Sequence, residues 1–314
     1  MDGKSNLSFT GITTFCRTPY VSEIDQVQAD VAVLGIPYDE AVGYRPGTRF
    51  GPRSIREYSM RFPYFNENGG QKGYWDIDKR RWFLTKTTMV DCGDVDVVPL
   101  NMAYVHQQIE ANIKGFLRSG ALPVSLGGDH SVTYPVVKAF ERLGPLSLVQ
   151  FDAHLDRRDT VGGVKYGHGS PIKRISELEY IEKIVTIGLR GLRAPEEDYL
   201  EAEARGDILI SCKTVREIGA GEVVNRIPFL GKCYVTIDID ALDPSVAPGT
   251  GTPEADGLTF YQLKEMLSGL AATNQIVGFD LVEVNPYLDS SGRTSLIAAQ
   301  LIVEFLAAIF AQRT

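Results

Sequence analysis

The chain has 314 residues, of which 44% are hydrophobic and 23% are charged, a composition typical of a globular protein with a large core. Its formal net charge of −8 argues against nucleic acid or an anionic membrane as the main partner. The first residues lack the basic and apolar regions of a signal peptide, and no apolar run reaches membrane-spanning length, so we expect a cytoplasmic protein.

The chain begins with an irregular stretch and continues as strands that alternate with helices. Residues 1–28 show little periodicity, and we interpret them as an N-terminal arm. Short apolar runs then predict strands near residues 30–37, 88–93, 122–126, 147–151, 184–188, 207–210, 233–239 and 275–282. Helical patterns cover residues 52–60, 103–119, 131–142, 171–178, 195–205, 259–271 and 294–311. This alternation predicts one α/β domain over residues 1–314, with three layers (α/β/α) around a mainly parallel sheet of about eight strands.

Several features between these elements have no assigned role. Residues 61–87 form a long aromatic and basic connection, which we expect to be a functional or oligomer-contact loop or else a packed surface excursion. His106 lies on the helix predicted at 103–119, away from other candidate ligands, so we expect a surface or half-buried histidine. The four cysteines lack CxxC spacing, which favours reduced thiols.

Three of the predicted strands end in residues that bind metal ions. In a parallel sheet the carboxyl ends of strands share one edge, where ligands bind. Burying charged side chains without a partner costs roughly several kcal/mol, so a cation is the cheapest partner. The candidate ligands at these strand ends are His130, Asp152, His154, Asp156, Asp238 and Asp240. Carboxylates mixed with imidazoles favour Mn, Fe, Ni or Zn over Ca, and the alternative is acidic turns that hold no metal.

With these residues placed, the sequence resembles the ureohydrolase family of arginases, agmatinases, guanidino-acid hydrolases and formiminoglutamases. The resemblance extends roughly from residue 30 to the C-terminus. Its motifs are Gly127-Gly-Asp-His130, Asp152-Ala-His-Leu-Asp156, Tyr166-Gly-His168-Gly-Ser170, Asp238-Ile-Asp240-Ala-Leu-Asp243-Pro244, Ala247-Pro-Gly-Thr-Gly-Thr-Pro253 and Glu283-Val-Asn-Pro286. The resemblance implies a three-layer α/β/α subunit, assembly into homotrimers or homohexamers, and hydrolysis of a guanidino group to urea plus an amine.

The resemblance also implies a dinuclear manganese centre, with Ni²⁺ as an alternative that the sequence does not separate from Mn²⁺. One ion would be held by His130, Asp152, Asp156 and Asp238, and the other by Asp152, His154, Asp238 and Asp240, so that Asp152 and Asp238 bridge the two ions. Glu283 matches the carboxylate that binds the guanidinium group, and His168 matches the histidine that shuttles protons. Asp129 and Asp280 lie beside these motifs and are expected either to orient a site residue or to cap a helix or turn.

The chemistry of the reaction agrees with these roles. A guanidinium carbon is a poor electrophile and needs a strong nucleophile, which two ions sharing one water can supply. Glu283 can pair with the planar fork of the guanidinium through two parallel hydrogen bonds. The amine leaves only when it is protonated, and a histidine with a pKa near ambient pH suits that task. The alternative is that His168 is a loop histidine without a role in the reaction.

The resemblance leaves the substrate open. Arginases carry an acidic residue after Gly188-Leu-Arg190, where this chain has Gly191, and Arg158 replaces an expected asparagine. Both departures argue against arginine. The forms His168-Gly-Ser-Pro171 and Leu189-Arg-Gly191 look more like the agmatinase branch, which converts agmatine to putrescine and urea. However, Arg157, Arg158 and Lys165 make the neighbouring loop basic, which suits a guanidino acid such as guanidinobutyrate or guanidinopropionate, while guanidine and biguanides are further alternatives.

The basic residues and the metal ligands also allow different roles. Arg157 and Arg158 could instead pair with Asp159 or with a neighbouring subunit. A metal-binding subunit without turnover would be expected to have an incomplete ligand set, and a single-metal deacetylase would not need His130. The glycine-rich stretches match no phosphate-binding loop. Release of urea from a guanidino compound separates these alternatives.

Overall fold

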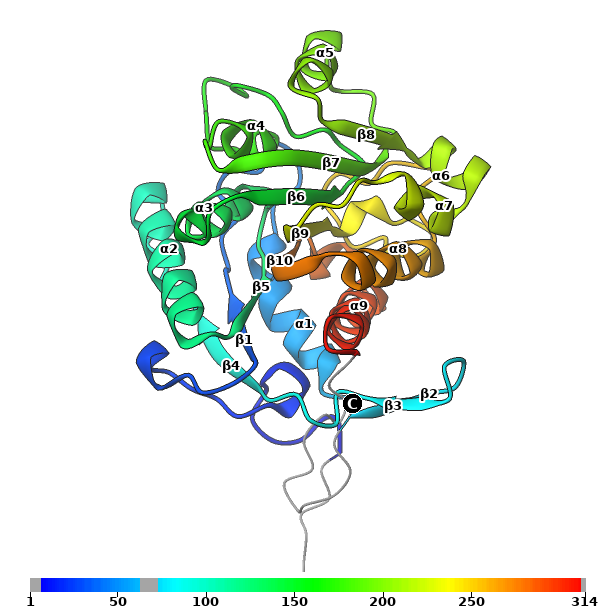
Figure 1. The fold of residues 1–314 in the computed structure, drawn as a ribbon. Coiled ribbons are helices and arrows are strands. Elements are labelled where there is room, and N and C mark those ends of the chain that lie inside the picture. Colours follow the sequence, from blue (N-terminus) through cyan, green and yellow to red (C-terminus); the bar gives the residue numbers. More distant parts are fainter. Residues whose placement is uncertain (1–6, 63–72, 312–314) are drawn as a thin grey trace, which may run out of the picture.

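A computed structural model describes residues 7–62 and 73–311 of the chain and contains an eight-stranded sheet at its centre (Figure 1). The strand order is β4-β1-β5-β10-β9-β6-β7-β8, and every neighbouring pair in this sheet is parallel. The strands are β1 (Val31–Gly35), β4 (Met89–Asp94), β5 (Leu122–Leu126), β6 (Leu146–Phe151), β7 (Ile181–Leu189), β8 (Ile208–Ser211), β9 (Lys232–Asp238) and β10 (Gln275–Val282). The predicted parallel sheet of about eight strands is confirmed.

Helices cover both faces of this sheet (Figure 1). One face carries α2 (Met102–Ser119), α3 (Thr133–Lys138) and α4 (Pro171–Ser176). The other carries α1 (Gly51–Ser59), α6 (Cys212–Ile218), α7 (Ala220–Arg226), α8 (Phe260–Thr273) and α9 (Arg293–Ile309), while α5 (Glu196–Arg205) lies beside β8. Each face of the sheet has its own hydrophobic core, and alternate residues of β1 point into one or the other. Val31 belongs to the same core as Ile55 of α1, and Ala32 belongs to the same core as Val105 of α2. The predicted three-layer α/β/α arrangement is therefore confirmed.

The central strands are mainly apolar because both of their faces are covered. Every residue of β1 and β6 is buried, as is typical of strands inside a parallel sheet. The covering helices have clear end signals in the sequence. The Asn101 side chain accepts a hydrogen bond from the backbone N–H of Tyr104 at the start of α2, and Gly120 ends that helix in a left-handed conformation.

The long connection at 61–87 contains a hairpin that the sequence patterns did not predict, and residues 63–72 lie outside the described part. The hairpin consists of β2 (Tyr74–Asp76) and β3 (Arg81–Phe83). Trp75 and Trp82 pair across its strands with ring centroids 5.8 Å apart, and Trp75 is 46% exposed. Neither tryptophan packs in the core, so a contact with another subunit stays a prediction for this hairpin. The helices α6 and α7 were also not predicted.

The described part of the N-terminal arm, residues 7–28, is irregular, as predicted, and it is attached to the sheet of its own chain. It contains two short 3-10 turns, and Phe15 within the first is fully buried. The Phe15 backbone N–H donates to Asp91 Oδ2 at 2.7 Å, and the Asp91 N–H donates to the Pro19 carbonyl at 2.9 Å. These bonds cover the outer edge of β4 and so protect an edge strand. No helix within residues 7–62 and 73–311 is both long and apolar enough to cross a membrane.

Candidate metal centre

The six predicted ligands converge beyond the carboxyl ends of three central strands, β5, β6 and β9. Asp152 directly follows β6, Asp238 is the last residue of β9, and His130 follows β5 after two glycines. These three side chains are buried. Because β9 lies between β6 and β10, and β10 lies beside β5, the parallel order brings all three strand ends to one edge of the sheet.

His130 faces three carboxylates. Its Nδ1 atom lies 3.1 Å from Asp152 Oδ2, 3.0 Å from Asp156 Oδ2 and 3.4 Å from Asp238 Oδ2. The same Nδ1 atom is buried and has no hydrogen-bond partner of acceptable geometry in the described structure. Buried polar atoms are rarely left without a partner, and a cation among these four groups would satisfy all of them.

His154 forms a second group with the other carboxylates. Its Nδ1 atom lies 3.5 Å from Asp152 Oδ1 and 3.1 Å from Asp240 Oδ2. Ligand atoms of His130, Asp152 and Asp238 lie within 4.8 Å of one another, and so do those of Asp152, His154 and Asp240. Asp152 belongs to both groups through different oxygen atoms. The geometry therefore fits two adjacent cations that share Asp152, and the bridging role of Asp238 stays a prediction.

The electrostatics of the cluster also fit a bound cation. Burial, followed by the nearby Asp240 and Asp152 carboxylates, raises the pKa of Asp238 well above its ordinary value. Burial likewise raises the pKa of Asp156 and of Asp240. These three carboxylates resist ionisation because they are buried and lie close to other carboxylates, and divalent cations among them would favour their ionised forms.

A chain of buried hydrogen bonds sets the orientation of His130. Its Nε2 atom lies 2.9 Å from Thr236 Oγ1, and the Thr236 hydroxyl donates to Asp280 Oδ1 at 2.6 Å. Tyr234 donates to the other Asp280 oxygen at 2.8 Å. Because Asp280 takes the hydroxyl proton of Thr236, the hydroxyl oxygen accepts from Nε2–H, and Nδ1 is left without a proton and able to bind a metal. Of the two roles expected for Asp280, the structure therefore supports the orienting one.

Two further residues orient ligands and were not identified from the sequence. Gln150 donates to Asp152 Oδ2 at 2.6 Å and accepts from Thr186 at 2.8 Å. Its position two residues before Asp152, on the same side of the strand, is a signal that could have found it. Glu254 lies 3.3 Å from His154 Nε2 but is distant in the sequence, so no local pattern points to it.

Glu283 and His168 lie together beside the cluster. Glu283 is buried, and its Oε1 accepts from the backbone N–H of His130 at 2.9 Å and lies 3.3 Å from His168 Nδ1. The Gly43 backbone N–H donates to His168 Nε2 at 3.0 Å. Burial lowers the pKa of His168, but the hydrogen bond and charge of Glu283 outweigh burial and raise this pKa to about 9. Asp129 instead takes the capping role, because it accepts from the N–H groups of Ser131 and Ala41.

A cavity of about 320 Å³ opens onto these residues. Its lining includes the ligands His154, Asp156 and Asp238, together with His168 and Glu283. Four further charged residues line the cavity: Arg157, Arg158, Arg193 and Asp198. The Arg157 side chain turns inward to Asp207, so the other three are the charged groups that face the cavity outside the ligand cluster and the His168–Glu283 pair. This volume suits a small organic molecule.

The predicted basic loop is only partly present. The Arg157 side chain is buried and donates to Asp207 Oδ2 at 2.6 Å, so the prediction that its charge faces a substrate is wrong. Lys165 is exposed and does not line the cavity. Arg158 does line the cavity, with Nη1 at 3.8 Å from Asp198 Oδ2. Neither Arg157 nor Arg158 pairs with Asp159, whose partner is Arg174.

Arg193 was not identified from the sequence, although it lines the same cavity. It is exposed and forms no ion pair or hydrogen bond within the described residues. It lies in an irregular connection after β7, where the sequence has no periodicity that predicts which side chains face inward. The fold alone brings this connection to the cavity.

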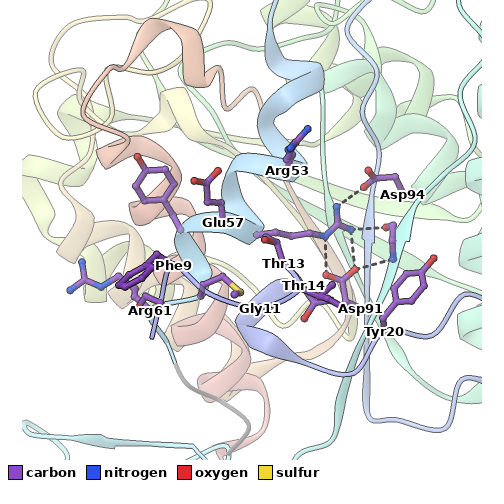
Figure 2. A pocket seen from close by; sticks show the side chains of 16 residues that line it. Phe9, Gly11, Thr13, Thr14, Tyr20, Arg53, Glu57, Arg61, Asp91 and Asp94 are labelled. Carbon is purple, nitrogen blue, oxygen red and sulfur yellow. Dashed lines mark hydrogen bonds and ion pairs between the residues drawn. The ribbon is translucent and has the colours of Figure 1, made fainter. Parts of the chain in front are cut away.

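A larger cavity lies elsewhere, and ion pairs of Arg56 lie at its wall (Figure 2). It measures about 1270 Å³ and is lined by the N-terminal arm, α1 and the end of β4. Arg56 at its wall donates from Nε to Asp91 Oδ2 at 2.8 Å and from Nη1 to Asp94 Oδ1 at 2.5 Å. None of the six candidate ligands lines this cavity. The cavity of about 320 Å³ is therefore the one that is lined by candidate metal ligands together with His168 and Glu283.

Comparisons with known proteins agree over nearly the whole chain. A family model described as the arginase family matches residues 29–308. Guanidinobutyrase from Pseudomonas aeruginosa is 34% identical over 318 residues, which covers 98% of this chain and 96% of that protein. Mitochondrial agmatinase from Gallus gallus is 34% identical over 313 residues, which covers 95% of this chain and 86% of that protein. The solved structure of proclavaminate amidino hydrolase from Streptomyces clavuligerus has a TM-score of 0.85 and 31% identity, covering 96% of this chain and 98% of that one.

Proposed function

The chain belongs to the arginase family and is a hydrolase of carbon–nitrogen bonds in linear amidines, and from this premise we propose that it releases urea from a guanidino compound at a dinuclear metal centre. The observation that carries the proposal is the buried, unpartnered Nδ1 of His130, which faces three carboxylates beside Glu283. The proposed ligands are His130, Asp152, His154, Asp156, Asp238 and Asp240. We propose Mn²⁺ as the metal, with Ni²⁺ as the alternative. When bound, two divalent ions lower the pKa of a shared water and supply a nucleophile at neutral pH.

Glu283 is proposed to hold the guanidinium group. Its carboxylate matches the planar fork of a guanidinium, which fixes the central carbon in one orientation. The hydrogen bond from the His130 backbone to Oε1 holds this carboxylate against the metal cluster. Because the site around Glu283 is buried, a cation paired with it is only weakly screened by water.

His168 is proposed to protonate the leaving amine. The Gly43 N–H donates to Nε2, so the ring proton of the neutral histidine lies on Nδ1, toward Glu283. Glu283 raises the pKa of His168, whereas the Gly43 N–H opposes a second proton on Nε2. A guanidinium that pairs with Glu283 cancels its charge and lowers the pKa of His168 again. Only the doubly protonated imidazolium can protonate the amine, so Nε2 must take up a proton and release the Gly43 N–H before the transfer. The pairing of Glu283 with the substrate then makes this imidazolium a stronger acid, and His168 returns to its neutral form when the amine leaves.

A panel of substrates tests this proposal. Urea release should be measured with agmatine, 4-guanidinobutyrate, 3-guanidinopropionate, arginine, guanidine and substituted biguanides, on enzyme loaded with Mn²⁺ or with Ni²⁺. We expect urea from at least one compound. A protein that binds metal but releases urea from none of them would be a non-catalytic metal-binding subunit, and the proposal would then be wrong.

The cavity lining favours a guanidino acid over agmatine as the substrate. Outside the ligand cluster and the His168–Glu283 pair, Arg158 and Arg193 line the cavity together with one carboxylate, Asp198, which leaves one positive charge in excess in this part of the cavity. Opposite charges about 4 Å apart attract by about 1 kcal/mol in bulk water and by more where water is sparse. The anionic tail of a guanidino acid gains this attraction, whereas the ammonium tail of agmatine meets repulsion.

The structure also gives a physical reason to disfavour arginine. A Cβ atom at Gly191 would lie 2.8 Å from the ring of His154, so an acidic side chain at this position would displace a candidate ligand. The chain therefore lacks room for the acidic residue that arginases carry directly after the Gly-Leu-Arg sequence.

Charge reversal at the mouth of the cavity tests the tail preference. We expect Arg158→Glu and Arg193→Glu each to raise the ratio of agmatine to 4-guanidinobutyrate efficiency by about tenfold, since about 1.4 kcal/mol corresponds to that factor. Lys213→Glu makes the same change of charge on the exposed surface of α6 and should leave the ratio unchanged. A wild-type preference for agmatine that survives both reversals would assign agmatine as the substrate.

Assembly and location follow from the family only as proposals. We propose a homotrimer or homohexamer in the cytoplasm, and light scattering of the purified chain tests the subunit number.

A further inference from the structure

We propose that Tyr166 is a positioning residue that holds the His168 loop in its active conformation, through an aromatic cluster formed by His106, Tyr134 and Tyr166. This inference rests on the proposed function, because it takes His168 as the proton donor. Tyr166 touches no candidate ligand and does not line the active-site cavity. Its effect on the reaction would therefore be transmitted through the loop.

The loop that carries His168 is fastened at its neck and tip. At the neck, the Arg158 N–H donates to the Gly169 carbonyl at 3.1 Å. At the tip, Val161 and Val164 exchange two backbone hydrogen bonds of 3.0 Å. Between these points, the His168 backbone N–H donates to the Ala41 carbonyl at 3.4 Å, but the backbone groups of Lys165 and Tyr166 form no backbone hydrogen bond within the described structure. The segment formed by Lys165 and Tyr166 therefore depends on side-chain contacts for its position.

Tyr166 supplies these contacts. Its ring stacks on Tyr134 with centroids 5.6 Å apart and planes inclined by 27°. It also meets the His106 ring edge-on, with centroids 5.6 Å apart and an angle of 88°. His106 and Tyr134 in turn meet at 6.0 Å, so the three rings contact one another in pairs. The Tyr166 hydroxyl has no hydrogen-bond partner among residues 7–62 and 73–311, which means that the ring rather than the hydroxyl makes the attachment.

The cluster links the loop to rigid parts of the site. His106 lies on α2, and Tyr134 lies on α3, directly after the turn that carries His130. Tyr166 precedes His168 by only two residues. Movement of Tyr166 from its partners would therefore shift the imidazole away from Glu283 and Gly43. Aromatic pairs add stability beyond that of burial, so the loss of two such contacts is expected to change a loop equilibrium by about tenfold.

Kinetics of Tyr166 variants test the proposal. We expect Tyr166→Ala to lower kcat at least tenfold while KM and bound metal stay near the wild-type values. Tyr166→Phe keeps the ring and should restore kcat. Tyr261→Ala removes an exposed tyrosine from α8 and serves as the matched control. In the His168→Asn background, Tyr166→Ala should cause no further loss, because the residue acts through His168. An unchanged kcat in Tyr166→Ala, or an equal loss in both backgrounds, would overturn the proposal.

Amide hydrogen exchange separates this proposal from the function on which it rests. Exchange across residues 160–168 should be faster in Tyr166→Ala than in the wild type and unchanged in Tyr166→Phe. This readout needs no substrate, so it stays decisive even if the enzyme releases urea from none of the compounds tested. Equal exchange in Tyr166→Ala and the wild type would show that the cluster does not hold the loop.

Discussion

At the scale of single residues, two residues of the site have backbone conformations that residues other than glycine rarely adopt. Glu283 has φ of 64° and Asp156 has φ of 51°, both in the left-handed region. Each such residue costs roughly 1–2 kcal/mol relative to the common conformations. The surrounding hydrogen bonds and strand ends hold both residues there. This strain is consistent with positions selected for chemistry rather than for stability.

Glu283→Gln tests the proposed guanidinium site. The substitution keeps the shape of the side chain but removes its charge. Hydrogen bonds to charged groups contribute about 1.5–3 kcal/mol, so we expect kcat/KM for the best substrate to fall by roughly 10–100-fold. Bound metal, measured by elemental analysis, should not change, because Glu283 is not a proposed ligand. Wild-type efficiency in this variant would mean that the substrate is held elsewhere.

His168→Asn tests the proposed proton donor. We expect kcat to fall by about 10²–10⁴-fold, the usual contribution of a general acid. The metals should stay bound, since His168 contacts Glu283 and Gly43 rather than the ligand cluster. Measurement of turnover and metal content in one preparation decides the role. Loss of metal would identify His168 as a ligand instead.

At the scale of helices and strands, the sequence predicted the sheet and the ligand-bearing strand ends because both follow from local patterns. Apolar runs such as that before Asp152 indicate interior parallel strands, and parallel strands place their ends together. Glu254 and Arg193 were missed because they reach the site from irregular connections that only the fold brings close. The charge of Arg157 was misplaced for the same reason, since its partner Asp207 lies on a distant segment.

His106 on α2 makes folding stability depend on pH. Burial lowers the pKa of His106 to about 4, against an ordinary value near 6.5. Between these values the unfolded chain binds a proton that the folded chain excludes, so the free energy of unfolding falls as the pH decreases through this window. We expect the wild type to lose more stability than His106→Gln between about pH 7 and about pH 5 in denaturant titrations. Equal losses in the two proteins would show that His106 is not excluded from protonation.

At the scale of the whole molecule, the site depends on the order of strands rather than on any one segment. The ligands come from the ends of β5, β6 and β9, which are separated by long stretches of sequence and meet only when the sheet is complete. Burial and neighbouring carboxylates raise the pKa values of Asp238 and Asp240, so the folded sheet carries an electrostatic cost that bound cations would relieve. We therefore expect bound metal to stabilise this edge of the folded sheet.

A titration of metal-free enzyme with Mn²⁺ tests the proposed dinuclear hydrolase most directly. Bound metal and urea release from the best substrate of the panel should be measured at each addition, for the wild type and for Asp238→Ala. We expect wild-type activity to saturate at two ions per chain. The Asp238→Ala variant should stay folded, lose bound metal and release no measurable urea. Full activity with one ion or none, or turnover and normal metal content in Asp238→Ala, would contradict the dinuclear assignment.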